Sequence, residues 1–217
     1  MSHKFTVIET ICINNHNFTL HQSGAVYWVE KQLLLISDVH LGKISHFRKF
    51  GSAVPQAAIG ENFNRLSQVV EHFNPAKICF LGDLFHSSLN MEWNLFEDWM
   101  EKISAEVILV AGNHDIISEL KYEKLGIKVY SEIITGSFLL THHPEERDSF
   151  FNICGHLHPG IKLRGFGLQT LKLPCFFQSS NQFILPAFGE FTGNFYVNPV
   201  QGDQVYAITK KEVILVS

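Results

Sequence analysis

The sequence has little that points to a membrane protein, a disulfide-bonded scaffold or a disordered chain. Its 217 residues contain four cysteines, none in a CxxC pair, so we expect buried, reduced thiols rather than a zinc or redox motif. No apolar run approaches the ~18 residues of a membrane span, and the first ten residues lack an apolar signal segment. We therefore expect a cytoplasmic protein that does not bind a membrane.

A basic excess and a linker are also missing. The formal net charge is −4, so the chain as a whole has no positive field that would hold nucleic acid. A polyanionic substrate would need local basic residues or bound cations. No repeat, low-complexity tract or Pro/Gly/Ser-rich linker divides the chain, and 46% of its residues are apolar. We expect one well-packed domain over residues 1–217.

The sequence does contain several short apolar runs, each of which ends abruptly in polar residues. Such continuous runs indicate strands that are buried on both faces of a sheet. Residues 55–73 and 90–103 show helical spacing, and we expect their aromatic residues to pack in the core rather than stack on bases. Residues 161–217 predict mostly antiparallel strands. The five early runs are QLLLISD (32–38), AKICFLGD (76–83), AEVILVAGN (105–113), SFLLTHH (137–143) and FFNICG (150–155).

This order of elements predicts an α+β fold in which two sheets pack face to face and helices flank them. Histidine, aspartate or asparagine follows every early run. The carboxyl ends of strands in α/β sheets converge on a ligand crevice, so we expect these side chains to meet there. Each one alone could cap a helix or close a turn, but turns do not require histidine repeatedly. The candidates are Asp38, His40, Asp83, Asn113, His142, His156 and His158.

Oxygen and nitrogen ligands with almost no cysteine suit Mn²⁺, Fe or Zn²⁺. In chain order, the motifs D-x-H, GD, GNHD, a strand-end His and GHxH resemble the calcineurin-like metallophosphoesterase superfamily over residues 33–160. The resemblance implies a four-layer α/β/β/α fold, in which two mixed sheets form a sandwich with helices outside. It also implies two divalent metal ions, for which we expect manganese, with iron or zinc as alternatives.

The same resemblance assigns the ligands. It implies that Asp38, His40 and His158 bind one metal, that Asn113, His142 and His156 bind the other, and that Asp83 bridges them. A shared carboxylate would offset the repulsion between two dications ~3.5–4 Å apart, and a metal-bridging hydroxide would be the nucleophile. Gly155 would leave room for a close backbone approach beside the metals.

Longer segments narrow the resemblance. SDVHLGKISHFRKFGSAVP (37–55), FLGDLFHS (80–87), GAVYW (24–28) and the later LPCFF and ILPAFGEFTG are similar to the bacterial ligase-associated DNA damage response phosphoesterases. This implies an endonuclease that cuts DNA phosphodiesters in repair, beside a DNA ligase, a helicase and an exonuclease. Two alternatives stay open: a phosphatase or pyrophosphohydrolase for a small nucleotide or lipid-linked substrate, and a non-catalytic module of a repair complex.

His114 is the candidate general acid, and we expect Asp115 to orient its ring and raise its pKa. A supporting hydrogen bond to the metal ligands is the alternative role for His114. In THHPE we expect His142 to bind metal and His143 to point away or contact substrate, because neighbouring residues of an extended segment face opposite sides.

The densest basic stretch is GKISHFRKF (42–50), which directly follows Asp38 and His40. Its cations are expected either to contact phosphate or to form a solvated helix face. Lys162 would extend this patch after His158. The substrate-binding candidates are Lys43, His46, Arg48, Lys49, His86, His143 and Arg164.

Overall fold

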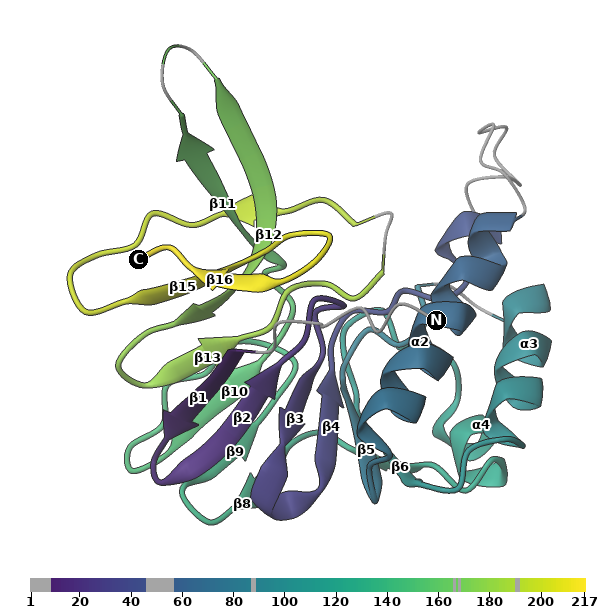
Figure 1. The fold of residues 1–217 in the computed structure, drawn as a ribbon. Coiled ribbons are helices and arrows are strands. Elements are labelled where there is room, and N and C mark those ends of the chain that lie inside the picture. Colours follow the sequence, from purple (N-terminus) through teal and green to yellow (C-terminus); the bar gives the residue numbers. More distant parts are fainter. Residues whose placement is uncertain (1–8, 46–56, 87–88, 166, 168, 190–191) are drawn as a thin grey trace.

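The computed structural model describes residues 9–45, 57–86, 89–165, 167, 169–189 and 192–217. They form two sheets, of seven and nine strands (Figure 1). The first sheet has the order β1-β2-β3-β4-β5-β6-β7. The second has the order β14-β11-β12-β13-β10-β9-β8, with β15 beside β12 and β16 beside β15. In these ranges no helix has both the length and the apolar character needed to span a membrane.

The first sheet is mixed, because β1 to β4 pair antiparallel whereas β4 to β7 pair parallel. Helices connect its parallel strands. The strands are β1 Glu9–Ile13, β2 His16–Leu20, β3 Val26–Trp28, β4 Leu33–Ile36, β5 Lys77–Leu81, β6 Glu106–Val110 and β7 Lys128–Tyr130. The helices are the 3-10 turn η1 Val29–Lys31 and the α-helices α2 Ala57–Phe73, α3 Met91–Met100 and α4 Glu119–Lys124.

The second sheet is also mixed. Strand β10 pairs parallel with β9 and β13, and β11 pairs parallel with β14, while its other pairs are antiparallel. Its strands are β8 Ile133–Thr135, β9 Phe138–Leu140, β10 Phe151–Cys154, β11 Pro159–Arg164, β12 Thr170–Gln178, β13 Gln182–Ile184, β14 Phe195–Tyr196, β15 Gln204–Ile208 and β16 Val213–Leu215.

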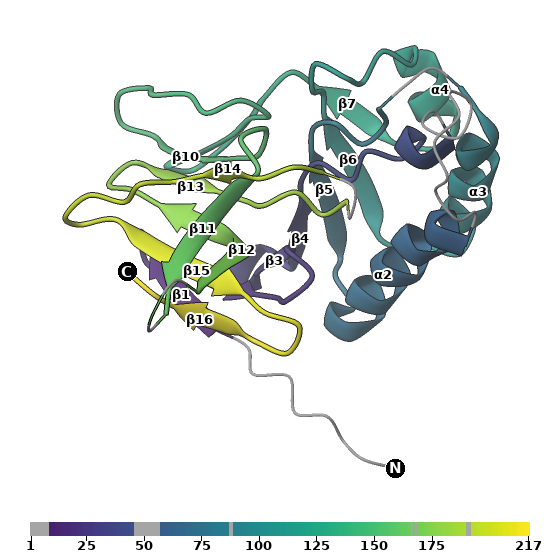
Figure 2. The same ribbon diagram turned by 90° about the horizontal axis from the view of Figure 1, so that it is seen from above.

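The layers confirm the expected sandwich of two mixed sheets, with one difference at its outer side. Figure 2 shows α2, α3 and α4 together on the face of the first sheet that is turned away from the second. The described ranges contain no helix after α4, so the helical layer expected outside the second sheet has no counterpart there.

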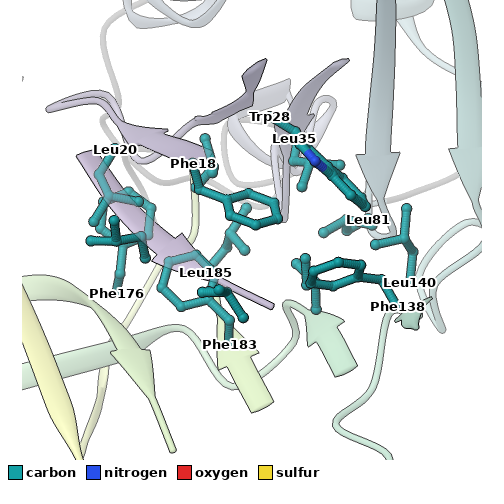
Figure 3. Close-up of a cluster of buried hydrophobic side chains, with 14 of the residues drawn as sticks. Phe18, Leu20, Trp28, Leu35, Leu81, Phe138, Leu140, Phe176, Phe183 and Leu185 are labelled. Carbon is teal, nitrogen blue, oxygen red and sulfur yellow. The ribbon is translucent and has the colours of Figure 1, made fainter. Parts of the chain in front are cut away.

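Strand β4 shows why continuous apolar runs predict this architecture. Alternate residues of a strand point to opposite faces. Leu33 and Leu35 therefore join the core between the sheets, whereas Leu34 and Ile36 join the core under the helices. Figure 3 shows the first of these cores, where Phe18, Trp28 and Phe138 pack together.

Helices α2 and α3 have the amphipathic patterns that the sequence predicts. The buried Trp93, Phe96 and Trp99 of α3 pack under the helices, as expected for core aromatics. Helix α3 begins after Asn90, whose side chain accepts a 2.8 Å hydrogen bond from the Glu92 amide, and it ends before the expected residue 103. The first two residues of the expected helix 55–73 lie outside the described residues.

Candidate metal centre

The parallel strands β4 and β5 end side by side, and their pairing continues past the strand ends. The Asp38 amide donates to the Gly82 carbonyl at 3.2 Å, and the His40 amide donates to the Asp83 carbonyl at 2.9 Å. The two segments that carry these candidates are therefore fixed against each other by backbone hydrogen bonds.

The second sheet delivers its histidines in the same way. Strands β9 and β10 are parallel, and beyond their ends the Gly155 amide donates to the His142 carbonyl at 3.1 Å. The His156 amide then donates to Asp38 Oδ2 at 2.9 Å, which joins the second sheet to the first. The ends of β4, β5, β9 and β10 thus meet at one place. The end of β6 joins them through Asn113, whose Oδ1 lies 3.1 Å from His142 Nε2.

The backbone is unusual at most of the candidate ligands. Non-glycine residues rarely have positive φ, and such conformations cluster at functional sites, where the surroundings hold them in place. Ten described non-glycine residues have positive φ, and half of them are candidate ligands. These are Asp38 (55°), His40 (52°), Asp83 (50°), His156 (66°) and His158 (49°).

Asp38, His40 and His158 form a first cluster, called site 1 below. Their ligand atoms lie within 4.8 Å of one another, and His158 Nε2 is 3.0 Å from Asp38 Oδ1. Asp38 Oδ1, both ring nitrogens of His40 and His158 Nε2 are buried without a hydrogen-bond partner. Buried polar atoms are normally paired. His40 Nε2 and His158 Nε2 lie 3.8 Å and 3.0 Å from Asp38 Oδ1, and this convergence fits a bound cation.

The protonation states at site 1 suit a metal as well. Burial lowers the pKa of His40 to about 3, although the nearby Asp38 charge opposes this shift. Burial alone would raise the pKa of Asp38, but His158 and the Ser37 hydroxyl outweigh it and hold that pKa below its usual value. A neutral imidazole beside an ionised carboxylate is the form in which these side chains bind metals.

Site 2 is defined by Asn113, His142 and His156. His142 Nδ1 donates to the Leu81 carbonyl at 3.0 Å, which leaves Nε2 as the ring atom that can bind a metal. This Nε2 lies 3.1 Å from Asn113 Oδ1, 3.1 Å from His156 Nδ1 and 3.4 Å from Asp83 Oδ1. Nitrogen and oxygen atoms of four side chains therefore converge here, as the ligands of a divalent cation do.

Asp83 lies between the two sites. One of its carboxylate oxygens is within 4.8 Å of ligand atoms of both Asp38 and His142. The His114 amide donates to Asp83 Oδ1 at 2.9 Å and holds the carboxylate in this position. The residues present therefore fit two divalent cations that share Asp83, and metal binding by the seven side chains stays a prediction.

Of the two alternatives expected for His143, the structure contradicts the one in which it points away, and contact with substrate stays a prediction. Its ring nitrogen lies within 4.8 Å of ligand atoms of His142 and His156, and its ring centroid is 4.0 Å from that of His156. The expectation assumed an extended segment, but β9 ends at Leu140 and residues 142–143 form a bend. Thr141 Oγ1 closes this bend with a 2.6 Å hydrogen bond to the His143 carbonyl. His143 is thus a further candidate ligand.

The expected pairing of Asp115 with the His114 ring is wrong. The Asp115 carboxylate accepts hydrogen bonds from the Gly112 amide at 2.9 Å and the Phe85 amide at 3.1 Å. No hydrogen bond joins it to the His114 ring within the described part of the chain. Burial raises the pKa of Asp115 to about 6. The Asp115 carboxylate thus fixes the loops that contain Phe85 and Gly112. The His114 ring lies instead between two other histidine rings, 4.6 Å from that of His86 and 5.7 Å from that of His40.

The candidate substrate-binding residues fall in different places. Lys43 is half-buried beside the centre, where burial lowers its pKa against the opposing charges of Asp38 and Asp83. The His86 ring lies 5.4 Å from the His40 ring, and Arg164 is exposed on β11. His46, Arg48 and Lys49 lie outside the described residues.

Two supporting residues were missed by the sequence analysis. Ser37 Oγ donates to Asp38 Oδ2 at 2.5 Å and orients that ligand. The buried Glu92 accepts from the Gly42 amide at 2.7 Å and from the Ser45 amide at 3.0 Å, and so anchors the loop after His40. An acidic residue in the apolar face of helix 90–103 was the available signal for Glu92, whereas nothing distinguished Ser37.

Gly155 has the role expected of it. An added Cβ would lie 1.6 Å from Ser37 Oγ and 2.5 Å from Asp38 Oδ2. Only glycine therefore allows the chain before His156 to lie against the Asp38 carboxylate.

The chain is similar to a known protein family and to proteins of known structure. Residues 31–179 match the family described as calcineurin-like phosphoesterase. The crystal structure of the Pseudomonas putida nuclease MPE is similar, with a TM-score of 0.83 and 28% sequence identity, over 96% of this chain and 100% of that chain. Yfce, a phosphoesterase from E. coli, has a TM-score of 0.45 and 16% identity over 85% of this chain and 97% of its own. No curated protein sequence matches the chain.

Proposed function

We propose that this chain, which belongs to the calcineurin-like phosphoesterase family, is a DNA endonuclease that acts in bacterial DNA repair. Members of this family are divalent-metal-dependent hydrolases of phosphoester bonds, and the two ligand clusters provide candidate sites for such ions. The DNA substrate, the repair role and manganese as the metal are the parts that go beyond family membership.

The observation that carries the proposal is the convergence of ligand atoms on both sides of Asp83. At site 1 the buried Asp38 Oδ1, His40 Nε2 and His158 Nε2 have no hydrogen-bond partner, and at site 2 His142 Nε2 faces two oxygens. Two metal ions held by these residues would supply a water of lowered pKa and positive charge opposite the phosphate oxygens.

The chain's own residues have separate tasks in this proposal. Lys43, near both Asp38 and Asp83, would place a positive charge beside the phosphate. His114 would donate a proton to the leaving oxygen, since its half-buried ring lies beside site 1, 5.7 Å from the His40 ring. Asp115 would act indirectly, because it fixes the loops that carry Asn113 and His86.

DNA is supported as the substrate by two observations. A similar protein of known structure is a nuclease, and its match with this chain extends over the whole length of that nuclease. Asn113 and His143 are exposed, so site 2 opens at the surface, where a polymer can reach it. We also propose that the protein works beside a DNA ligase, a helicase and an exonuclease.

Hydrolysis assays with the purified protein and Mn²⁺ test the proposal. We expect it to cleave bis-(p-nitrophenyl) phosphate and to nick circular plasmid DNA, and we expect Asp83→Asn to abolish both activities. Asp98→Asn removes a comparable charge from the exposed face of α3 and should leave both unchanged. Rapid cleavage of a phosphomonoester or a pyrophosphate without any nicking would assign the centre to a small substrate instead.

A further inference from the structure

The β11–β12 hairpin has a charge pattern unlike that of the rest of the chain. The chain has 21 acidic residues, but none falls between positions 149 and 189. The same segment contains the cations Lys162, Arg164 and Lys172, all exposed on this hairpin. Figure 1 shows the hairpin projecting from the body of the molecule. A protein with net charge −4 thus extends one arm that is locally positive.

Strand alternation divides the hairpin into two faces. Ile161, Leu163 and Leu173 lie on one face, where they pack with Val205 and Ala207 of β15. Residues of the other parity point to the opposite face. The register places Lys162 directly opposite Lys172, and Arg164 opposite Thr170. The apolar face fastens the hairpin to the sheet, and the cations are left on the other face.

Tyr196 of β14 adds an aromatic ring to this cationic face. Its register partner is Gly160, two residues before Lys162. The Lys162 ammonium lies 4.6 Å from the centre of the Tyr196 ring, and the Lys172 ammonium lies 5.6 Å from it. Like charges directly opposite each other destabilise a strand pair, and the shared ring offsets only part of this. Within the described residues, none of the three cations forms an ion pair with a carboxylate.

The cationic face begins at the metal centre. Strand β11 starts at the residue after His158, and the Phe195 amide donates to the His158 carbonyl at 3.0 Å, so β14 is held against the same point. With a rise of ~3.3 Å per residue, Lys162 lies about 13 Å and Arg164 about 20 Å along the chain from His158. These positions are beyond the reach of a single phosphate bound at the metals.

We propose that this face, formed by Lys162, Arg164, Lys172 and Tyr196, binds the phosphate backbone of the DNA substrate several nucleotides away from the bond that is cut. The inference rests on the proposed nuclease function and adds a surface for the flanking strand. Exposed lysines bind phosphates as point charges. A phosphate bound between the ammonium groups of Lys162 and Lys172 would offset the repulsion between these two positive charges. An acidic chain would acquire local affinity for DNA in this way.

A double variant, Lys162→Gln with Lys172→Gln, tests the surface. Its matched control is Lys31→Gln with Lys102→Gln: Lys31 precedes β4 and Lys102 follows α3, both away from the strand ends that carry the ligands. Fluorescence anisotropy of a labelled 30-nucleotide DNA with metal-free protein reports binding without cleavage. Cleavage of bis-(p-nitrophenyl) phosphate with Mn²⁺ reports an intact centre.

We expect the hairpin variant to bind the DNA roughly tenfold more weakly at low salt, and the slope of log K against log[salt] to fall by about 1.5 to 2. Cleavage of the small diester should be unchanged, and the control variant should match the wild type in all three assays. Equal affinity and equal salt slope in the hairpin variant and the wild type would overturn the inference, while DNA cleavage by both would leave the nuclease assignment intact. A wild-type protein that cleaves only small phosphoesters would instead refute the nuclease assignment.

Discussion

The His156 amide donates a 2.9 Å hydrogen bond to Asp38 Oδ2, across 118 residues of sequence. Asp38 lies after strand β4 of the first sheet, and His156 lies after strand β10 of the second. The bond therefore connects the two sheets of the sandwich at the metal centre. The same Oδ2 accepts the Ser37 hydroxyl, and Asp38 Oδ1 is left for a ligand. Folding and site assembly are therefore coupled here, and a defect in the packing of these segments should impair both.

Gly155→Ala tests this coupling. The new Cβ would overlap Ser37 Oγ at 1.6 Å, so we expect urea unfolding to show a loss of at least ~2 kcal/mol, together with loss of hydrolysis. Gly60→Ala is the matched control, because Gly60 lies within α2 with nothing within 4 Å of an added Cβ. It should gain about 0.5–1 kcal/mol, as alanine is the better helix former, and retain activity. Equal stability of the two variants would show that the approach to Asp38 is not close.

His156→Ala and His158→Ala should each remove a different metal ion. His158 lies with Asp38 and His40 in site 1, while His156 lies beside His142 in site 2. We expect anomalous diffraction from Mn²⁺-soaked crystals of each variant to retain the peak at the other site, and DNA cleavage to fall by at least roughly 100-fold in both. Loss of the same single peak from both variants would contradict the assignment of these histidines.

The role of His114 predicts a dependence on the leaving group. An alkoxide leaving from DNA needs a proton, whereas p-nitrophenolate is stable without one. His114→Gln should therefore slow DNA cleavage by about 10²- to 10⁴-fold and change the cleavage of bis-(p-nitrophenyl) phosphate much less. Equal losses on the two substrates would contradict a role of His114 as general acid, because the backbone amide of residue 114 still donates to Asp83 in this variant.

Protonation of His21 should destabilise the fold at acid pH. Burial, with His72 and Arg65 nearby, lowers the pKa of His21 from 6.5 to about 4, and the Ser23 amide donates to its Nδ1 at 3.1 Å. Between these two values the unfolded chain binds a proton that the folded chain does not. The stabilisation is therefore full above pH 6.5 and is lost as the pH falls toward 4, by up to ~3 kcal/mol.

Urea unfolding in EDTA at pH 7.5, 5.5 and 4.5 measures this loss. His21→Gln keeps a side-chain acceptor but cannot be protonated, so its unfolding free energy should fall less with pH than that of the wild type. Parallel pH curves for the two proteins would show that His21 titrates normally.

The fold and the centre were predictable to the extent that each depended on local patterns. Runs such as LLLI in β4 are apolar at every position because both faces are covered, and their ends locate Asp38 and Asp83. The three strands before β4 were not predicted as strands, because their alternation of buried and exposed residues is spread over short segments separated by turns.

The remaining errors concern backbone direction and long-range contacts. His143 was placed by assuming an extended chain, but a bend after Leu140 turns its ring toward His156. Asp115 was paired with its neighbour His114, yet its carboxylate binds the Phe85 amide, which lies 30 residues away. The sequence shows which residues are neighbours in the chain. Which atoms their side chains contact depends on how the loops pack, and the sequence pattern does not show this.

The central claim is that strand ends from both sheets build two adjacent metal sites around Asp83. An anomalous difference map from crystals of the wild-type protein soaked in Mn²⁺ tests it most directly. The account predicts two peaks, one among Asp38, His40 and His158 and the other among Asn113, His142 and His156, with Asp83 in contact with both. A map with no peak at these clusters, or with Mn²⁺ bound only elsewhere, would contradict it.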